Sequence, residues 1–480
     1  MNVLFAIAEG YPFAKTGGLG DVGGSLPGAI NQLRGRVRVI MPRYGSIPRE
    51  LAKNIKPVTS FRISLGWRRQ YCGLGELDYK GVRYYFIDNE YYFKRDKLYG
   101  YKDDGERYAF FCRGALESVV HLKGFRPDLL HCHDWHTALI PVMLKEFYCS
   151  DPYYYGMKTL FTIHNLRHQG IYPREALWDL LGLRDNSRAV QDLDFGGNVN
   201  YLKGALLNAD GISTVSPTYA WEIQDPFYGE GLDDVLRKRK GQLVGILNGI
   251  DYDHFNPETD PCLFVNYGDS LDKKAENKSK LQALLHLPVN KQVPMIALIS
   301  RLTDQKGLDL LAHILEELLQ DKLQLVVLGV GERKYERMFE YFTSRYPDKI
   351  AVGLMFNEVL ARRIYAGADL LLMPSLFEPC GLSQMIAMRY GTVPLVRETG
   401  GLKDSVLPFN KYTREGNGFS FANYNAHELL FTIRRALSIY RDDVPAWEKL
   451  RERARQRDFS WNRSAGKYLR LYENTIEGSF

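Results

Sequence analysis

The stretch Asp-Leu-Leu-Leu-Met-Pro-Ser-Leu-Phe-Glu-Pro-Cys-Gly-Leu occupies residues 369–382 and decides the fold. Its apolar first half, 369–374, is typical of a strand buried on both faces of a parallel sheet. Glu378 follows this strand, and Gly381 then opens a predicted helix over 383–389. Open α/β sheets bind their ligands at such strand-to-helix junctions. Taken alone, Glu378 is equally compatible with an acid that caps the helix.

The same alternation of strand and helix continues in both directions. Short apolar segments alternate with amphipathic ones, which predicts parallel sheets with helices on both faces. Strands are expected at 3–8, 37–41, 129–132, 159–163, 211–215 and 243–247, with an antiparallel hairpin at 71–79 and 83–87. A second series is expected at 294–300, 323–329, 350–354, 369–373 and 393–396, and a last helix at 461–476. The segment 249–291 has poor periodicity, and we place a hinge near 245–255.

The bulk composition indicates a globular protein with more than one core. A chain of 480 residues is too long for a single core, so two domains are expected. The net charge of +6 is mild and spread out, which does not predict nucleic-acid binding, and the basic cluster 237–240 is expected to be a solvated surface turn. No apolar run approaches the ~20 residues that span a bilayer. Residues 1–8 are interpreted as a first buried strand and not as a signal peptide.

The cysteines point to a reducing compartment. The six cysteines form no C-x-x-C pair and have no regular spacing, so neither a disulfide framework nor a zinc scaffold is expected. We therefore expect free thiols and a bacterial cytoplasmic location.

A glycine-rich segment, Lys-Thr-Gly-Gly-Leu-Gly-Asp-Val-Gly, occupies residues 15–23. It contains the letters of a dinucleotide fingerprint, but the glycines lie well beyond the first strand, and no acid closes the second strand. We therefore reject a nicotinamide site. The N–H groups of Gly17 and Gly18 can approach an anion closely, and Lys15 adds a point charge. The alternative is a tight turn with a surface lysine.

Three histidines and an aspartate lie within residues 131–136. His131 and His133 share one face of the expected strand, which is compatible with metal ligation. No second cluster supplies the remaining ligands with convincing spacing, so we favour a strand end that presents Asp134 to a polar ligand. His164 ends the next strand, where it is either a polar contact, a proton carrier or a structural residue.

Two cations mark the first strand of the second series. Arg301 and Lys306 follow it, and a guanidinium fork beside an ammonium suits a diphosphate. Further along, residues 398–402 read Glu-Thr-Gly-Gly-Leu, and the N–H groups of Gly400 and Gly401 are candidates to hold phosphate. A plain helix-starting turn is the alternative there.

Together these motifs resemble the bacterial glycogen synthases and the plant starch synthases that use ADP-glucose, and the match covers essentially the whole chain. The resemblance rests on segments 15–19, 133–135, 164–165, 201–204, 213–217, 248–249, 300–307, 377–382 and 399–402. It implies an α/β fold of two Rossmann-like, doubly wound domains that face a deep cleft. The implied boundaries are 1–245 for the acceptor-side domain, 246–458 for the nucleotide-sugar domain and 459–480 for a helix that returns to the first domain.

The implied reaction transfers glucose from ADP-glucose to the non-reducing 4-hydroxyl of an α-1,4-glucan such as glycogen, with retention of configuration and without metal or cofactor. By resemblance, the catalytic residues are Lys15, Asp134, His164, Arg301, Lys306 and Glu378. The implied substrate-binding residues are Gly17, Gly18, Asp21, Asn165, Asn248, Gln305, Cys380, Gly381, Leu382, Ser383, Thr399, Gly400 and Gly401. No nucleic-acid or membrane partner is implied, and the oligomeric state is left undetermined.

Two questions stay open at this point. Leu354 follows Gly353 where the family commonly has a tyrosine that stacks on adenine, so the choice between ADP-glucose and UDP-glucose is open. The activity has two alternatives: a related retaining glycosyltransferase with another donor or acceptor, or a glucan-binding protein whose activity has lapsed. The presence of Lys15, Arg301, Lys306 and Glu378 argues against the second.

Overall fold

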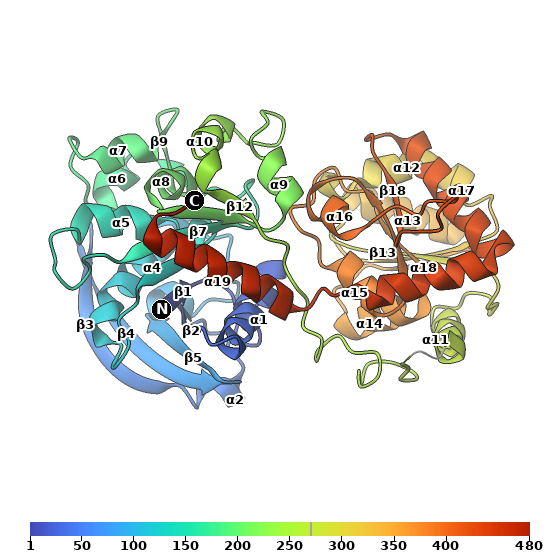
Figure 1. The fold of residues 1–480 in the computed structure, drawn as a ribbon, viewed down its shortest axis with the longest axis horizontal. Helices are drawn as coiled ribbons and strands as arrows, with labels where there is room; N and C mark the ends of the chain where they lie inside the picture. The colour runs from blue at the N-terminus through green and yellow to red at the C-terminus, as the bar shows by residue number, and fades with distance from the viewer. Residues whose placement is uncertain (269–270) are drawn as a thin grey trace. The chain divides into compact units, whose positions relative to one another are not determined.

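The computed structural model describes residues 1–268 and 271–480 of the chain. These residues divide into two compact units, which are drawn in Figure 1. Unit 1 contains Met1–Gly249 together with Ser460–Phe480, and unit 2 contains Ile250–Phe459. The chain therefore leaves unit 1 and later returns to it.

A nine-stranded sheet forms the centre of unit 1, in the order β12-β11-β7-β6-β1-β2-β5-β4-β3. Neighbouring strands from β12 to β5 are parallel, whereas β4 is antiparallel to both β5 and β3. The bounds are β1 Asn2–Ala6, β2 Arg36–Pro42, β3 Lys56–Leu65, β4 Arg68–Tyr79, β5 Val82–Asp88, β6 Leu129–His133, β7 Lys158–Ile163, β11 Gly211–Thr214 and β12 Leu243–Gly245. A small second sheet pairs β8 Ile171–Pro173, β10 Asn198–Asn200 and β9 Asp194–Phe195.

Helices cover both faces of the large sheet. α1 packs against α19, whereas α4, α5 and α8 pack together in a second layer (Figure 1). Right-handed crossovers place these two groups on opposite faces, because the winding reverses at β1. The longer helices are α1 Gly18–Gln32, α4 Asp104–Ser118, α5 Leu139–Phe147, α8 Tyr201–Asn208 and α19 Trp461–Glu477. The short ones are α2 Arg49–Ala52, α3 Glu90–Phe93, α6 Ala176–Asp179, α7 Arg188–Leu193, α9 Pro217–Glu222 and α10 Asp233–Lys238.

Unit 2 is built on a six-stranded, all-parallel sheet in the order β15-β14-β13-β16-β17-β18. Its strands are β13 Met295–Ile299, β14 Gln324–Leu328, β15 Ile350–Gly353, β16 Leu370–Met373, β17 Val393–Arg397 and β18 Phe419–Phe421. Its helices are α11 Leu271–Leu284, α12 Leu308–Leu318, α13 Arg333–Arg345, α14 Glu358–Gly367, α15 Ser383–Arg389, α16 Gly400–Ser405, α17 Ala426–Asp442 and α18 Val444–Gln456. The winding reverses at β13, as it does at β1 in unit 1. The predicted class of two doubly wound α/β domains is thereby confirmed.

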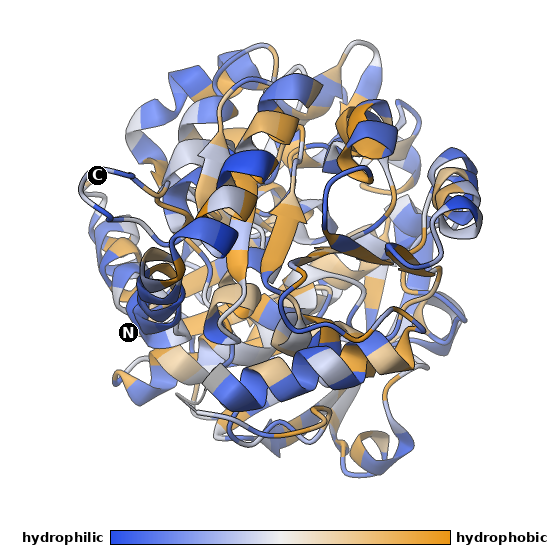
Figure 2. Cartoon of the chain, turned by 90° about the vertical axis from the view of Figure 1, so that its right-hand side faces the viewer, coloured by the Kyte–Doolittle hydropathy of each residue, from blue (hydrophilic) through white to orange (hydrophobic). Residues whose placement is uncertain are grey.

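The core of unit 2 lies between its sheet and its helices. In Figure 2 its strands are coloured mostly as hydrophobic, while the helices carry both colours. Leu311 and Leu315 of α12 are fully buried together with Ile433 of α17, and these two helices pack against each other. Residues four positions apart share one helix face, so the leucine spacing in the sequence produces this contact.

The last helix returns to unit 1, as predicted. Near the start of α19, the Ser464 hydroxyl donates to the Leu247 carbonyl at 2.6 Å. Near its end, the Tyr472 hydroxyl lies 2.8 Å from Nδ1 of His131, whose other ring nitrogen, Nε2, lies 2.6 Å from the Thr162 hydroxyl. This buried chain of polar contacts ties α19 to the central strands β6 and β7.

The helix α11 was not predicted, because its buried face is polar. α11 lies in the segment 249–291, which has poor periodicity, and residues 269–270 of that segment lie outside the described residues. The ammonium of Lys274 is buried and donates to the carbonyls of Tyr365 and Ala366, while Lys278 forms a 2.6 Å ion pair with Asp369. A helix that buries lysines has no apolar stripe for a periodicity argument to find. Strand β3 was also missed, since it is largely exposed.

No helix in the described part of the chain is both long and apolar enough to cross a membrane.

We expect Tyr472→Phe to weaken the attachment of α19. The substitution leaves Nδ1 of the fully buried His131 without its partner, which costs about 1–3 kcal/mol. Hydrogen exchange read by mass spectrometry should show this loss of opening free energy in α19 and β6. Tyr155→Phe is the matched control, because Tyr155 is 81% exposed. Equal protection of α19 in the two variants would contradict the role of the Tyr472 hydroxyl.

Candidate active site

The predicted catalytic residues of unit 1 follow three neighbouring strands. Lys15 follows β1, Asp134 follows β6 and His164 follows β7. Because these strands are parallel, their carboxyl ends share one edge of the sheet. Ligands of open α/β sheets bind at this edge, where the winding reverses between β1 and β6.

A buried carboxylate holds the glycine-rich loop in place. Glu9, which is 3% exposed, accepts hydrogen bonds from the backbone N–H of Thr16 at 2.5 Å and from the Thr16 hydroxyl at 2.7 Å. It also accepts from the Tyr99 hydroxyl at 2.7 Å and, more weakly, from the Gly17 N–H at 3.4 Å. The Gly17 N–H is therefore turned partly toward the protein. Gly18 starts α1, where N–H groups of the first turn lack helical acceptors.

The remaining glycines of this run are explained by close packing. A Cβ atom on Gly23 would lie 2.2 Å from the Glu9 carbonyl oxygen, which no side chain can tolerate. The run therefore lets α1 pack directly against the loop that follows β1.

Lys15 is paired within the loop region. Its ammonium lies 2.7 Å from Oδ1 of Asp21, and the two side chains are 33% and 21% exposed. A half-exposed ion pair is weakly bound, so Lys15 can exchange this partner for an incoming anion at small cost.

Asp134 is the most constrained residue of the site. Its φ of 57° lies in the left-handed region, and its side chain is 7% exposed. Oδ1 accepts from the His164 N–H at 2.8 Å and from the Asn165 N–H at 3.3 Å. Burial nevertheless dominates and raises the pKa of Asp134 to about 7. The carboxylate therefore fixes the backbone at the end of β7 and titrates near neutral pH.

The histidines form a buried neutral pair. Nδ1 of His133 lies 2.9 Å from Nε2 of His164. Burial lowers the pKa of His164 to about 3, and it also lowers the pKa of His133 well below its ordinary value. Both rings are thus uncharged at neutral pH, and Nε2 of His133 is buried without a hydrogen-bond partner among the described residues.

A metal site is not supported by this histidine cluster. Both ring nitrogens of His131 are already engaged, by Tyr472 and Thr162. Within residues 1–268 and 271–480, no group of three histidine, cysteine or acidic side chains is arranged to hold a metal ion.

The two predicted asparagines occupy different positions. The Asn165 side chain accepts from the Arg167 N–H at 3.1 Å, which forms a local turn after β7. Asn248 follows β12, which lies beyond β7 and β11 in strand order, so this residue stands apart from Lys15 in the sheet. Its side chain is 5% exposed, and Oδ1 has no hydrogen-bond partner in the described structure.

The candidate residues of unit 2 meet across its own reversal point. Lys306 follows β13 and Glu378 follows β16, and these strands are neighbours. The Lys306 ammonium lies 2.6 Å from Oε2 of Glu378, with side-chain exposures of 15% and 9%. The Ser375 hydroxyl donates to the same oxygen at 3.1 Å. Glu378 is therefore a paired carboxylate after a strand and not a helix-capping acid, since α15 begins at Ser383.

Arg301 and Gln305 differ sharply in their environments. The Arg301 side chain is exposed and makes no ion pair or hydrogen bond with the residues that the structure describes. Gln305 is 9% exposed, its side chain donates to the Phe377 carbonyl at 3.4 Å, and its own carbonyl accepts from the Leu376 N–H at 2.9 Å. Arg301 is thus open to an anion, whereas Gln305 joins the two strand-end loops.

Part of the glycine turn before α16 forms hydrogen bonds within the protein. The Gly401 N–H donates to the Glu378 carbonyl at 3.1 Å. Gly400 has a φ of 44°, and a Cβ atom there would lie 2.0 Å from the Glu378 carbonyl oxygen. The Gly401 N–H, expected to be available to phosphate, is therefore committed to the Glu378 loop. Thr399 is fully buried at the start of this turn.

The segment from Cys380 to Ser383 connects Glu378 to α15. Cys380 is 6% exposed, whereas Gly381, Leu382 and Ser383 are half-buried. Gln384 holds this segment, because its side-chain amide donates to the Cys380 carbonyl at 3.1 Å and to the Gly381 carbonyl at 2.9 Å. The same edge of the unit 2 sheet thus carries all its predicted residues from Arg301 to Gly401.

Sequence reasoning missed three residues that organise these sites. Glu9 and Tyr99 support the glycine loop, and Ser375 supports Glu378. A signal existed for Glu9 and Ser375, because each lies just beyond a strongly apolar strand. The signal at Tyr99 is only that it lies in the aromatic-rich stretch 91–101, and its partner Glu9 is ninety residues away in the chain.

Two protein-family models match this chain, one in each half. A family model described as the starch synthase catalytic domain matches residues 2–238, and one described as glycosyl transferases group 1 matches residues 286–457. Glycogen synthase from Desulfitobacterium hafniense is 53% identical over 479 residues, which is 100% of each chain. Glycogen synthase from Geobacillus stearothermophilus is also 53% identical and covers 99% of this chain and 98% of its own.

Solved structures agree with the family models. The catalytic domain of starch synthase IV from Arabidopsis thaliana, bound to ADP and acarbose, superimposes with a TM-score of 0.90 at 34% identity, covering 99% of each chain. A sucrose-phosphate synthase from Thermosynechococcus elongatus gives a TM-score of 0.60 at 19% identity, which is a likeness of fold alone.

The raised pKa of Asp134 predicts a pH-dependent stability. Its carboxyl has an ordinary pKa of 3.8 when unfolded and about 7 when folded, so the folded state holds more protons between these values. The free energy of unfolding should therefore fall as the pH rises through this window, by up to about 1.4 kcal/mol per pH unit. Asp134→Asn keeps the hydrogen-bond acceptor and tolerates the positive φ, but it cannot ionise.

Urea titrations of both proteins at several pH values give the measurement. The wild type should lose stability relative to Asp134→Asn as the pH rises from about 4 to 7, and the difference should level off above that. Parallel stability curves for the two proteins would show that Asp134 has an ordinary pKa.

Proposed function

This chain belongs to the glycogen synthase and starch synthase family of glycosyltransferases, and we propose that it transfers glucose from ADP-glucose to the non-reducing 4-hydroxyl of an α-1,4-glucan. The observation that carries the proposal is the cation set beside Glu378. Lys306 is paired to this carboxylate, while Arg301 remains exposed at the end of the neighbouring strand. In this proposal unit 2 binds the donor and unit 1 binds the acceptor glucan.

The proposed chemistry needs positive charge at the leaving group. Breaking the bond between glucose and diphosphate places negative charge on the diphosphate, and fixed cations stabilise it. Arg301 supplies a bidentate fork and Lys306 a point charge. Glu378 is held by Lys306 and Ser375, and we assign it to contact with the donor glucose.

Unit 1 supplies mainly neutral polar groups in this proposal. His164 is uncharged at neutral pH because burial lowers its pKa to about 3, so its ring serves as a hydrogen-bonding group for a sugar hydroxyl. Asp134 fixes the backbone of His164, and the carbonyl of that residue is assigned to face the anomeric carbon. Lys15 is assigned to the phosphates or the sugar, with Asp21 as its resting partner.

The remaining predicted residues are proposed as substrate contacts or as supports for them. Gly17, Gly18 and Asn165 belong to the loops of unit 1 around Lys15 and His164, and Asn248 offers a buried carbonyl without a partner among the described residues. In unit 2 the segment 380–383 and the turn 399–401 flank Glu378. Gln305 acts through the loops that it joins.

A related structure supports adenine as the nucleobase of the sugar donor. The related starch synthase IV structure contains ADP, which favours an adenine nucleotide for this chain. Leu354, at the expected stacking position, packs against the apolar core of unit 2, whereas Phe356 two residues later is 88% exposed. Leu354 itself carries no ring that could stack on the nucleobase.

A cytoplasmic location is part of the proposal. All six cysteines are free thiols, and four of them are buried. Free thiols suit a reducing compartment.

The donor assignment is tested by glucose transfer to glycogen. We expect transfer from ADP-glucose to exceed transfer from UDP-glucose, and to be unchanged by a chelator, since no residue set holds a metal in the proposed chemistry. Radiolabelled donor and precipitation of the glucan give the measurement. A preference for UDP-glucose would overturn the base assignment, and transfer from neither donor would overturn the proposed function.

Arg301→Ala tests the role of the exposed cation. Removing one preorganised group that stabilises developing negative charge lowers turnover about 100- to 1,000-fold. Stability should not change, because the Arg301 side chain has no partner in the described structure. Lys306 is a poorer first choice, since its removal leaves the buried Glu378 unpaired and weakens folding as well.

Arg337→Ala provides the matched control for this measurement. Arg337 lies on α13 of the same unit, is exposed, and likewise makes no ion pair with the described residues. Turnover and melting temperature should both stay at the wild-type values in this variant. A normal rate in Arg301→Ala would remove Arg301 from the mechanism.

A further inference from the structure

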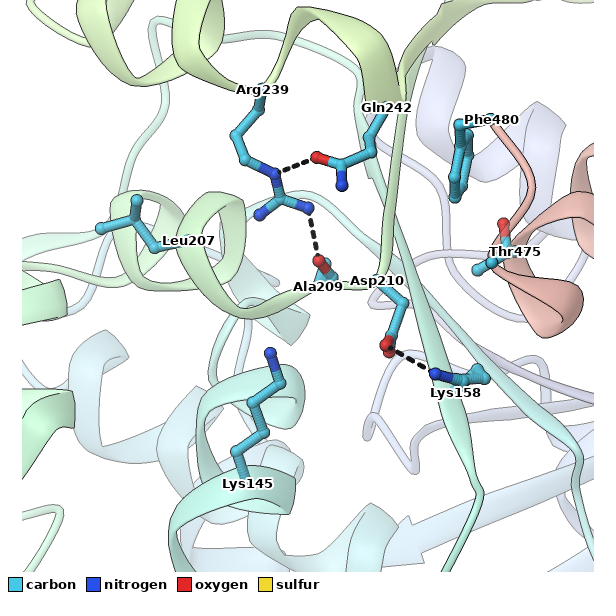
Figure 3. Close-up of a pocket in the computed structure, with 10 residues that line it drawn as sticks. Lys145, Lys158, Leu207, Ala209, Asp210, Arg239, Gln242, Thr475 and Phe480 are labelled. Atoms are coloured by element: carbon cyan, nitrogen blue, oxygen red, sulfur yellow. Dashed lines mark hydrogen bonds and ion pairs between the residues drawn. The ribbon is translucent and has the colours of Figure 1, made fainter.

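A basic pocket lies at the opposite end of the unit 1 sheet from Asp134 and His164. It has a volume of about 330 Å³ and is shown in Figure 3. The pocket is built at the amino ends of β7, β11 and β12, whereas Asp134 and His164 follow the carboxyl ends of strands. Its lining is Lys145, Lys158, Leu207, Ala209, Asp210, Arg239, Gln242, Thr475, Gly478 and Phe480.

One carboxylate belongs to this lining, and it is already engaged. Asp210 lies 3.3 Å from the Lys158 ammonium (Figure 3). Its other oxygen accepts from the Thr159 N–H at 2.8 Å and from the Thr159 hydroxyl at 3.0 Å. Asp210 therefore offsets the charge of Lys158. The other cations of the lining, Lys145 and Arg239, have no ion-pair partner among the described residues.

Arg239 is held rigidly by neutral groups. Its guanidinium donates to the Leu206 carbonyl, to the Ala209 carbonyl at 2.6 Å, and to the Gln242 side chain. The two carbonyls belong to the last turn of α8 and to the residue that follows it, where free carbonyls attract a cation. Among the described residues Arg239 forms no ion pair, and burial lowers its pKa. Arg239 is thus a fixed, partly desolvated positive charge, unlike the solvated surface turn expected for residues 237–240.

Lys145 supplies the second unbalanced charge. It extends from α5 into the pocket (Figure 3) and makes no ion pair or hydrogen bond within the described part of the chain. Arg188 and Asp192 lie nearby, but they are 3.8 Å apart and offset each other. The side chains around the pocket therefore carry more positive than negative charge, and Asp210 offsets only part of the excess.

We propose that this pocket binds a small phosphate-bearing anion. A guanidinium held in one orientation beside a flexible ammonium suits a phosphate group. The guanidinium can form two parallel hydrogen bonds to phosphate oxygens, and the flexible lysine side chain can move its charge toward them. The volume of about 330 Å³ is at the lower end of the range of small-molecule sites and accommodates a sugar phosphate. Gln242 and Thr475 offer polar contacts to hydroxyl groups, and Phe480, which is 46% exposed, offers an apolar face.

The ligand would join parts of unit 1 that are distant in sequence. Lys145 comes from α5, Arg239 follows α10, and Thr475 and Phe480 belong to the end of the chain at α19. A ligand that binds only the folded state raises the melting temperature, and the rise continues with the logarithm of ligand concentration above the Kd. The proposal goes beyond the transfer reaction, and its outcome is independent of activity.

The test uses inorganic phosphate and glucose 6-phosphate as probes. Calorimetric titration of the full chain measures their affinities in the wild type, in Lys145→Ala and in Lys123→Ala, with potassium chloride at equal ionic strength as a salt control. Lys123 is an exposed lysine of the same unit that makes no ion pair in the described structure. We expect affinity for both probes to fall about tenfold in Lys145→Ala and to be unchanged in Lys123→Ala.

Gln242→Glu is the second variant, and it preserves the acceptor for Arg239 while adding a carboxylate. It should raise the melting temperature without phosphate and abolish the phosphate-induced rise. Stronger binding of glucose 6-phosphate than of phosphate would show that the sugar is also recognised, and equal binding would restrict the site to the phosphate group. Equal affinities in Lys145→Ala and Lys123→Ala, or an equal rise with chloride, would overturn the proposal.

Discussion

Parallel pairing of the central strands is the constraint on which both units depend. Parallel strands send all their carboxyl ends to one edge, and the winding of each sheet reverses at its first strand, β1 or β13. Loops that are far apart in sequence then meet at that edge. Lys306 and Glu378, seventy-two residues apart, become an ion pair of 2.6 Å for this reason. The chemistry of each unit is thus a consequence of its strand order.

The carboxyl edges of the two sheets carry side chains of different charge. In unit 1, burial keeps His133 and His164 neutral and brings the pKa of Asp134 to about 7, so that edge suits an uncharged polyhydroxyl ligand. In unit 2, Glu378 neutralises Lys306, while Arg301 keeps an unbalanced charge. Preorganised charge stabilises a transition state best where it has already been desolvated at the expense of folding. The buried Lys306–Glu378 pair meets that condition.

Periodicity predicted most of the strands, because that signal is local, although β3 and β18 were missed. The roles of the candidate site residues stay predictions. What could not be predicted depends on tertiary partners. The lysines of α11 are buried only because the carbonyls of Tyr365 and Ala366 accept from Lys274. Gln305 and Gly401 are residue types that often contact ligands. In the structure, the side-chain amide of Gln305 and the backbone N–H of Gly401 donate to carbonyls of the loop that carries Glu378. Local sequence shows that a polar group lies at a strand end, but it does not show whether that group is hydrogen-bonded within the protein or available to a ligand.

The same distinction applies to the other end of the unit 1 sheet. The amino ends of parallel strands seldom form ligand sites, so basic residues there read as surface charge in the sequence. In the structure, Arg239 is fixed by carbonyls at the end of α8, and Lys145 lines the same pocket without an ion-pair partner among the described residues. Folding has therefore placed two cations at one pocket, with Arg239 held by neutral acceptors and Lys145 exposed to solvent. Neither cation has an ion-pair partner within the described residues, and an anion in the pocket would contact both, which is why we regard the basic pocket as a binding site.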